Sequence, residues 1–292
     1  MMLSIISINY KKSHLTINCI DSLYKLYNDD FEKNKFELII VENGSEDDSL
    51  DFINIKIAKD SIKNIKVINN KKNEGFAKGC NIGAKEAKGK YLLFLNNDTT
   101  VMDKGIVRMV EYMDKNIDVS ILGGQLTNVN GEKQSSAGKF YTLFNTFLLL
   151  LGMQKFGLID KSFNKVTEVD WVKGAMFMMR KDVFDKLSGF DEKIFMYIED
   201  MELCYRAKKA GFRTFFYPDV SVIHQDQGSS SRSFAVANIY KGLLYFYKKH
   251  RSNMEYILVK AMLYVKAYVA ITIGYITRNK YLTTTFRQAI QF

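Results

Sequence analysis

Asp98 is the residue whose position in this sequence most clearly suggests chemistry. It lies in the stretch Tyr91 to Thr99, which reads YLLFLNNDT. The apolar run before it is too short for a helix and has the length of a buried strand. Asn97 and Asp98 therefore stand at the carboxyl end of a predicted strand, where ligands bind in open α/β sheets. A carboxylate there suits Mg²⁺ or Mn²⁺ bound to a diphosphate, although Asn-Asp pairs are also common in ordinary turns.

Asp200 and His224 are two further candidates. Glu199 and Asp200 precede the helical stretch MELCYRAKKA, and a helix N-terminus stabilises a carboxylate in its charged form. A helix-capping role would explain Asp200 equally well. His224 ends a predicted strand, as Asp98 does. An isolated histidine is more often a surface residue than a ligand, but its place at a strand end favours a function.

Small residues form a third group of candidates. Gly174 and Ala175 interrupt a strand-like stretch at residues 170–179. They allow a ligand to approach the backbone, or they mark a bulge or tight packing. The stretch NEGFAKGCNIG has the look of a dinucleotide fingerprint but does not follow the first strand as such a motif requires. We expect Gly75 in a tight turn and the two later glycines on one helix face, where they permit close packing.

The elements that must position these residues alternate regularly. The order strand–helix repeats through the first hundred residues, which predicts a mostly parallel sheet flanked by helices. Residues 131–165 are less regular, and the apolar run at 140–151 is either a helix packed on the domain or a patch facing lipid or acceptor. The predicted strands lie at residues 3–10, 36–41, 65–68, 92–96, 119–122, 170–179, 214–217 and 220–224. One helix is predicted to begin at residue 13, two more cover 103–115 and 181–187, and the helical stretch MELCYRAKKA ends at Gly211.

The composition is that of a globular protein with a net positive charge. Of its 292 residues 47% are hydrophobic and 25% charged, and the formal net charge is +10, which fits nucleic acid, an anionic membrane surface or phosphorylated substrates equally well. No cluster of basic and aromatic residues has the pattern of a nucleic-acid reader, so we expect no nucleic-acid partner. The three cysteines are widely spaced, and we expect reduced thiols in a cytoplasmic protein without a signal peptide.

Residues 232–292 differ in character from residues 1–231, which we take as the main domain. Helical, aromatic-rich and basic stretches cover 234–250 and 254–276. The second is long enough to cross a bilayer but carries Lys260 and Lys266, so it is a poor spanning segment. Tyrosine-rich apolar helices with lysines suit the membrane interface. The alternative is a helical pair that packs on the domain or on a partner subunit.

Seven segments in this order resemble family 2 glycosyltransferases of the GT-A fold, in particular the rhamnosyltransferase-like branch. Each segment alone is a weak signal, but their order is specific, and together they cover residues 3 to 231. The resemblance implies an α/β fold of the GT-A type, a Rossmann-like, mostly parallel sheet with flanking helices, to which the C-terminal helical extension is added. The segments are SIISINY, VENGSEDDS, NEGFAKGCNIG, FLNND, WVKGAMFMMRKDVFDKLSGFDE, FMYIEDMELCYRAKKAGF and VIHQ.

The resemblance implies a role for each matching residue. Asp98 and His224 correspond to ligands of a Mn²⁺ or Mg²⁺ ion, and Asp200 to the catalytic base. Given such a base, we expect Glu199 beside it to orient or contact the acceptor. Asn9, Tyr10 and Glu42 correspond to the nucleotide base pocket, and Asn81 to a support of the loop that borders the nucleotide. Together with the small pair noted above, the residues implied in binding the nucleotide sugar are Asn9, Tyr10, Glu42, Asn73, Gly75, Phe76, Asn81, Asn97, Gly174 and Ala175.

The implied activity is inverting, metal-dependent transfer of a sugar from a dTDP- or UDP-linked donor to a glycan or lipid-linked acceptor at the inner face of the cell membrane. Two departures weaken the match: the family usually has Asp where Glu42 stands, and its DxD motif is reduced to Asn97-Asp98. A catalytically silent binding or scaffold subunit and a nucleotide-dependent oxidoreductase are the alternatives; the latter would need a glycine-rich turn after the first strand. The sequence leaves open whether the protein forms a homo-oligomer.

Overall fold

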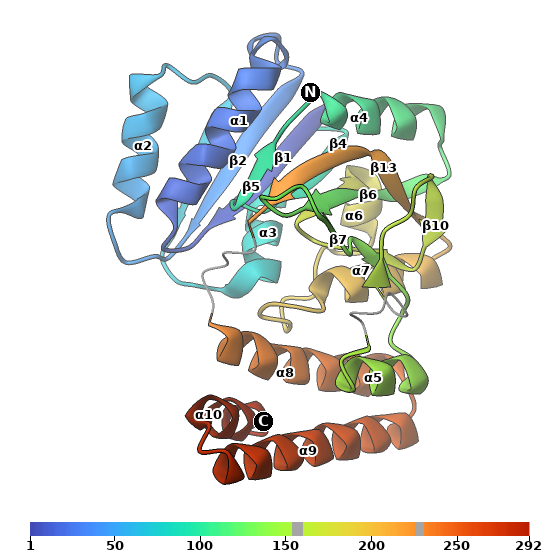
Figure 1. Cartoon of the computed structure of the whole chain (residues 1–292). Coiled ribbons are helices and arrows are strands. Elements are labelled where there is room, and N and C mark those ends of the chain that lie inside the picture. Colours follow the sequence, from blue (N-terminus) through green and yellow to red (C-terminus); the bar gives the residue numbers. More distant parts are fainter. Residues whose placement is uncertain (154–159, 226–230, 292) are drawn as a thin grey trace.

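The computed structural model describes residues 1–153, 160–225 and 231–291. A ten-stranded sheet runs through the molecule in the order β10-β13-β6-β12-β4-β1-β2-β3, with β5 paired to β13 and β7 to β6. Four strands form its parallel part, and three helices connect them (Figure 1). These are β1 (Leu3–Asn9), α1 (Ser13–Glu32), β2 (Phe36–Asn43), α2 (Ser49–Lys59), β3 (Ile65–Asn70), α3 (Gly75–Glu86) and β4 (Tyr91–Leu95).

The rest of the sheet is mixed. β12 is antiparallel to both of its neighbours, β4 and β6, whereas β13 is parallel to β6. Three short strands form a separate sheet beside the main one, in the order β11-β8-β9. The strands of the mixed part are β5 (Thr99–Val101), β6 (Val119–Thr127), β7 (Lys133–Gln134), β10 (Thr167–Val169), β12 (Met176–Arg180) and β13 (Arg213–His224), and those of the small sheet are β8 (Ala137–Gly138), β9 (Asp160–Lys161) and β11 (Trp171–Val172).

Two apolar clusters, one on each face of the sheet, form the core. Alternate residues of each strand point to opposite faces, so Ile5 and Leu93 pack under α1 and α4, whereas Ile6 and Phe94 pack under α3, α6 and α7. The sheet is therefore sandwiched, as the strand–helix alternation predicted. The helices not yet given are α4 (Gly105–Lys115), α5 (Leu143–Leu150), α6 (Lys181–Lys186), α7 (Glu199–Lys209), α8 (Arg232–His250), α9 (Asn253–Ile276) and α10 (Lys280–Ala289).

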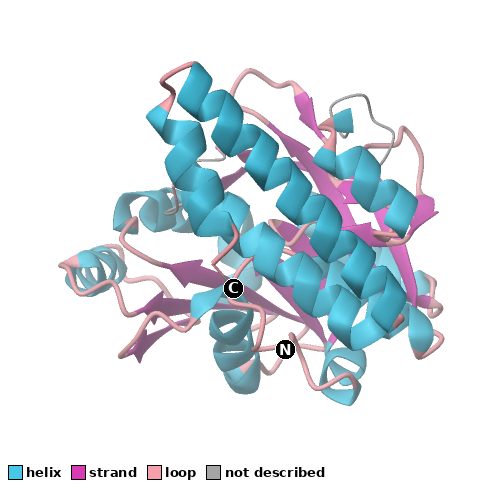
Figure 2. Cartoon of the chain, turned by 90° about the horizontal axis from the view of Figure 1, so that it is seen from below, coloured by secondary structure: helices cyan, strands magenta, loops and turns pink. Residues whose placement is uncertain are grey.

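The C-terminal helices pack on the domain. Buried residues of α8, α9 and α10, among them Phe246, Leu263 and Phe286, belong to the same apolar cluster as α3 and α7. Figure 2, seen from the side of these helices, shows them laid across the sheet. Packing on the domain, one of the two possibilities that the sequence left open, is thus observed. The same helices still expose a large apolar surface, since Ile257 and Ile276 are 62% and 78% exposed.

Two strand predictions need correction. The stretch at 170–179 is not one strand: it divides into β11 of the small sheet and β12 of the main sheet, with Gly174 and Ala175 between them. The two strands predicted around Pro218 are one strand, β13, whose pairing with β6 shifts register between Tyr217 and Ser221. Proline has no N–H to donate to a ladder and is tolerated at such an irregularity.

The predicted close packing of Gly79 and Gly83 is confirmed, and Gly75 is the first residue of α3 and not part of a separate turn. Gly75 opens α3 with φ +84°, and a Cβ there would lie 2.3 Å from the carbonyl oxygen of Phe195. Gly83 packs on β1, where a Cβ would lie 2.6 Å from a methyl carbon of Ile6. The apolar run at 140–151 forms α5, which packs on α9 yet leaves Phe144 largely exposed. The three cysteines are buried free thiols, as expected.

Candidate active site

A cavity of about 380 Å³ opens at the carboxyl ends of β1 and β4. The strand order β3-β2-β1-β4 reverses direction between these two strands, and such switch points are where open α/β sheets bind ligands. Of the residues predicted from the sequence, those that line the cavity are Tyr10, Asn73, Phe76, Asn97, Asp98, Gly174, Ala175, Glu199, Asp200 and His224.

Asp98 and His224 meet in this cavity because of strand pairing. The turn after β4 carries Asp98 and leads into β5, and β5 pairs with the end of β13, so that Thr99 lies opposite His224. The Oδ1 atom of Asp98 is 3.4 Å from Nε2 of His224, and the two side chains are only 5% and 13% exposed. A carboxylate and an imidazole nitrogen therefore converge on one enclosed point.

Gln134 fixes the orientation of the His224 ring. Its Nε2 donates a hydrogen bond to the backbone oxygen of His224 at 3.1 Å, so its Oε1 is directed at Nδ1 of the ring, 2.9 Å away. An amide oxygen only accepts, which places the proton on Nδ1 and leaves a lone pair on Nε2, beside Asp98. A ring nitrogen held by a hydrogen bond in this way is the usual arrangement of a histidine that binds a metal.

The donor set fits a divalent ion held jointly with a diphosphate. Among the residues that the structure describes, no group of three His, Cys, Asp or Glu side chains is placed to bind a metal, so the protein alone would not complete a coordination shell. Mg²⁺-type sites commonly use one or two protein ligands and fill the rest with substrate oxygens and water. Oδ1 of Asn96, a residue of the cavity lining, is buried without a hydrogen-bond partner in the described chain and is a third candidate donor.

Asp200 is held in the cavity by the start of α7. Two residues with positive φ, Tyr197 (69°) and Ile198 (74°), precede this helix; positive φ is rare for a β-branched residue and marks a strained turn. Oδ2 of Asp200 accepts a hydrogen bond from the N–H of Gly174 at 2.9 Å, and Oδ1 accepts one from the N–H of Met201 at 2.7 Å. The carboxylate is thereby fixed, with Gly174 beneath it.

The two adjacent carboxyl groups, Glu199 and Asp200, differ in how far their surroundings raise the pKa. Burial raises the pKa of Asp200, while its bonds to the two backbone N–H groups and the charge of Lys173 oppose that rise. Burial and the neighbouring charge of Asp200 raise the pKa of Glu199 much further, and Oε2 of Glu199 has no hydrogen-bond partner in the described part of the chain. Both pKa values are therefore raised, that of Glu199 the more strongly, so Asp200 is the member of the pair that ionises first.

Four predicted site residues do not line the cavity. Asn9 and Glu42 are register partners on β1 and β2, both buried, and the amide of Asn9 donates to the Glu42 carboxylate. Glu42 also accepts from the N–H of Ser45 at 2.7 Å, so its oxygens are engaged within the protein. Gly75 lies against the backbone of the 195 loop, as described above. The Asn81 side chain donates to the backbone oxygen of Phe190 and accepts from its N–H, both at 2.9 Å, and so supports the 189–192 loop.

Sequence reasoning missed several residues of the cavity. Lys173 and Asp160 both line it. Burial and the charge of Asp200 raise the pKa of Asp160 to about 6, with Lys173 opposing the rise. Lys173 stands directly before the small pair at 174–175, which is a signal that could have drawn attention to it. Asp160 lies in an irregular region of the sequence and offers no such signal.

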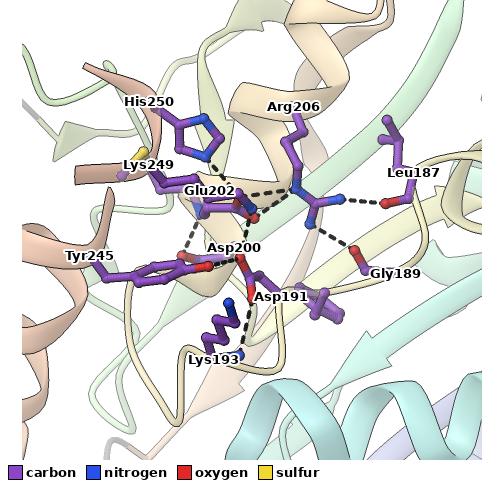
Figure 3. Close-up of polar contacts among 12 residues, drawn as sticks. Leu187, Gly189, Asp191, Lys193, Asp200, Glu202, Arg206, Tyr245, Lys249 and His250 are labelled. Carbon is purple, nitrogen blue, oxygen red and sulfur yellow. Dashed lines mark hydrogen bonds and ion pairs between the residues drawn. The ribbon is translucent and has the colours of Figure 1, made fainter. Parts of the chain in front are cut away.

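A buried ionic network ties α7 to the C-terminal helices (Figure 3). Glu202, two residues after Asp200, is fully buried and accepts hydrogen bonds from Arg206, Lys249 and His250 at 2.8–3.0 Å. Burial alone would raise the pKa of Glu202, but the bonds from these basic groups outweigh it and lower that pKa below its usual value. The end of α8 therefore helps to hold the helix that presents Asp200.

Comparisons with known proteins agree with this geometry. The family model described as "Glycosyl transferase family 2" matches residues 4–188. The rhamnosyltransferase WbbL of Escherichia coli is 29% identical over 56% of this chain and 65% of its own length. The low-salt glycan biosynthesis hexosyltransferase Agl10 of Haloferax volcanii is 26% identical over 82% of this chain and 72% of its own.

Structural similarity extends over the C-terminal helices. The mannosyltransferase PcManGT of Pyrobaculum calidifontis, solved in complex with GDP-Man and Mn²⁺, superposes with a TM-score of 0.61 at 14% identity and covers 99% of this chain and 84% of its own. At that identity the likeness concerns the fold alone, which is that of the GT-A glycosyltransferases. The match to WbbL spans just under two thirds of that relative. The family match covers well over half of this sequence, and the chain belongs to glycosyl transferase family 2.

Proposed function

We propose that this protein transfers a sugar from a nucleotide-diphosphate donor to a hydroxyl group of a glycan or lipid-linked acceptor, with inversion and with the help of Mn²⁺ or Mg²⁺. The observation that carries the proposal is the convergence of Asp98, His224 and Asp200 on one cavity at the switch point of the sheet. The first two are the donor set for a cation, and the third is a fixed carboxylate.

Each side chain then has a defined task. Asp98 and Nε2 of His224 would hold the ion, which when bound stabilises the negative charge that builds on the departing diphosphate. Tyr10, Asn73 and Phe76 would contact the nucleotide. Asp200 would accept the proton of the acceptor hydroxyl as it attacks the anomeric carbon. A single displacement with one base inverts that carbon, and the neutral Glu199 would position the acceptor.

The donor is proposed to be dTDP- or UDP-linked, on the strength of the resemblance to rhamnosyltransferase-like enzymes and the similarity to WbbL. We further propose that the enzyme works at the cytoplasmic face of the membrane, in peripheral contact through its C-terminal helices. Residues 232–292 contain ten Lys or Arg and one Glu, so nearly all of the net charge of +10 lies there. Basic helices with exposed apolar residues favour anionic lipid surfaces.

One helix of the described chain, α9, has the length and composition to span a bilayer, with a mean hydropathy of 1.6. Its buried residues Val259, Leu263 and Ala267 are integrated in the core of the domain. A spanning position would remove these contacts, so the proposal keeps α9 on the protein, with its exposed face toward the lipid.

The test is thermal stabilisation by UDP, dTDP and GDP, each with and without Mn²⁺, in wild type and Asp98→Ala. A ligand that binds only the folded state raises the melting temperature. We expect Mn²⁺-dependent stabilisation by UDP or dTDP that Asp98→Ala abolishes. Stabilisation without any sugar transfer to acceptor in wild type would favour the silent binding subunit. Absence of nucleotide binding would overturn the transferase proposal.

A further inference from the structure

A second cavity, of about 450 Å³, lies outside the candidate active site. It is bounded by the N-terminus of α5, the C-terminal half of α7 and Arg251 in the short connection between α8 and α9. In Figure 1 these segments lie together on the side of the sheet away from α1 and α2. Its lining holds four basic side chains and one acidic side chain: Lys139, Lys208, Lys209, Arg251 and Asp170.

The one acidic side chain is already engaged. Asp170 accepts from Nζ of Lys208 at 2.7 Å through Oδ1 and from the N–H of Phe140 at 3.1 Å through Oδ2. The other three cations, Lys139, Lys209 and Arg251, make no ion pair with a described carboxylate. Like charges that share a cavity repel one another, so an anion bound between them would lower the free energy of the folded protein.

Aromatic rings hold the cations in place. The Arg251 guanidinium lies over the rings of Tyr205 (5.3 Å) and Phe246 (5.8 Å). Nζ of Lys209 also lies over the Tyr205 ring, at 5.3 Å. Such cation–π contacts restrain long side chains that would otherwise spread into solvent. Nε of Arg251 is buried without a hydrogen-bond partner among the described residues.

The start of α5 adds to the positive potential. Thr142 caps this eight-residue helix, and Thr142 and Asn145 both line the cavity. The first N–H groups of a helix and its dipole favour an anion. Exposed lysines are most often a solvated surface. Here they surround a cavity, with aromatic rings, the Arg251 guanidinium and a helix N-terminus around the same space.

We propose that this second cavity binds a phosphate group. Phosphate offers several acceptor oxygens at once, and arginine matches its geometry with paired donors. The group is either that of a soluble phosphoester or that of an anionic phospholipid headgroup; Phe144, 68% exposed on α5 beside the cavity, would contact the acyl region in the second case. The site rests on its own residues and is independent of the sugar-transfer proposal.

The site has a physical connection to the active site. Phe140 and Thr142 line the second cavity, whereas Tyr141 between them lines the active-site cavity. Arg251 donates to the backbone oxygen of Tyr141 at 3.4 Å. One segment of chain is therefore the wall between the two cavities, and a phosphate bound to Arg251 would act on the backbone of an active-site residue.

The experiment compares two double variants that each remove two exposed lysines. Lys139→Gln with Lys209→Gln changes the cavity, and Lys59→Gln with Lys63→Gln makes the same change in charge at the end of α2, on the opposite side of the molecule. Inorganic phosphate is titrated into each by isothermal calorimetry without metal. We expect the cavity variant to bind at least about tenfold more weakly than wild type, as befits lost charge-assisted hydrogen bonds, and the α2 variant to bind as wild type.

Flotation with vesicles separates the two sources of phosphate. Phosphatidylglycerol vesicles, with phosphatidylcholine vesicles as reference, are mixed with the same three proteins. Weaker flotation of the cavity variant than of the α2 variant identifies a headgroup site; equal flotation together with selective loss of phosphate binding identifies a soluble phosphoester. Equal behaviour of both variants in both assays, or loss of phosphate binding in Asp98→Ala, would overturn the proposed site, the latter because it would place the phosphate in the active-site cavity.

Discussion

His224 lies at the end of β13 with Nε2 of its ring 3.4 Å from Oδ1 of Asp98, and the pairing of β13 with the short strand β5 brings them together. Neither residue alone makes a metal site. Their ability to act together as ligands depends on the orientation of the His224 ring, and Gln134 on β7 sets that orientation through two hydrogen bonds. Gln134, through its hydrogen bond with Nδ1, thus decides whether the lone pair of Nε2 faces Asp98.

Gln134→Ala should therefore weaken Mn²⁺ binding while sparing the fold. Loss of a residue that orients a metal ligand typically costs about 10- to 100-fold in affinity. The measurement is Mn²⁺ titration by electron paramagnetic resonance in the presence of UDP. Gln134→Glu is the matched control, since its carboxylate still accepts from Nδ1 of His224, and we expect a smaller loss. Equal affinities in all three proteins would contradict the orienting role.

Asp200→Asn and Glu199→Gln should differ sharply, although they are neighbouring and equally conservative changes. Removing a general base lowers kcat by about 10²- to 10⁴-fold, and Asn retains an oxygen for the N–H of Gly174. Gln mimics the neutral carboxyl that the raised pKa of Glu199 implies, so kcat should fall much less in Glu199→Gln than in Asp200→Asn. Turnover by both variants, with nucleotide-induced stabilisation as the control for donor binding, checks this. Similar losses in both would argue against Asp200 as the base.

The pH profile should report the charge of Lys173. A base works only when ionised, and the pKa of Asp200 is raised, so kcat should fall with decreasing pH at a higher pH than an ordinary aspartate would give. Lys173 opposes this rise. Lys173→Met should therefore raise the pKa of Asp200 further and move the acidic limb of kcat to higher pH. Lys59→Met, on the distant α2, is the control, and a limb that stays in place in Lys173→Met would contradict the assignment.

The strand ends explain what the sequence could predict. Asp98, Asp200 and His224 were found because each follows or precedes a regular element whose end must face the ligand edge of the sheet. Asn9 and Glu42 also stand at strand ends but do not line the cavity, because they are register partners whose side chains hydrogen-bond each other across β1 and β2. Local sequence gives the end of a strand, but the partner of a side chain there depends on the neighbouring strand.

The residues that the sequence did not predict come from irregular structure. Gln134, Tyr141 and Asp160 reach the site from two-residue strands and their connections, and such short elements carry no periodicity to detect. The C-terminal helices were visible as helices, but their apolar residues do not distinguish lipid from protein as the partner. In the folded chain, Leu263 and Phe246 are buried in the domain, so their partner is protein. The exposed face of the same helices is the part that the membrane proposal concerns.

Glu202→Gln should destabilise the protein more than any exposed substitution of the same type. Removing one partner from a buried ionic network leaves the other charges without compensation, which costs about 3–5 kcal/mol of unfolding free energy. Glu86→Gln is the matched control: its carboxylate is about half exposed and pairs with Lys66 on the surface, and such pairs contribute at most about 1 kcal/mol. Urea unfolding at pH 7 measures both, and equal effects would contradict the importance of the network.

The stabilisation that Glu202 provides should depend on pH. The folded-state pKa of Glu202 is lower than its usual value of 4.5, so the unfolded chain binds the proton more readily. The stabilisation is then fully present at neutral pH and is lost as the pH falls from about 4.5 through the lower folded-state pKa. The difference in stability between wild type and Glu202→Gln should shrink over that range. A difference that stays constant down to the onset of acid unfolding would mean that the Glu202 charge contributes nothing, and that only the shape of the side chain matters at the α7–α8 contact.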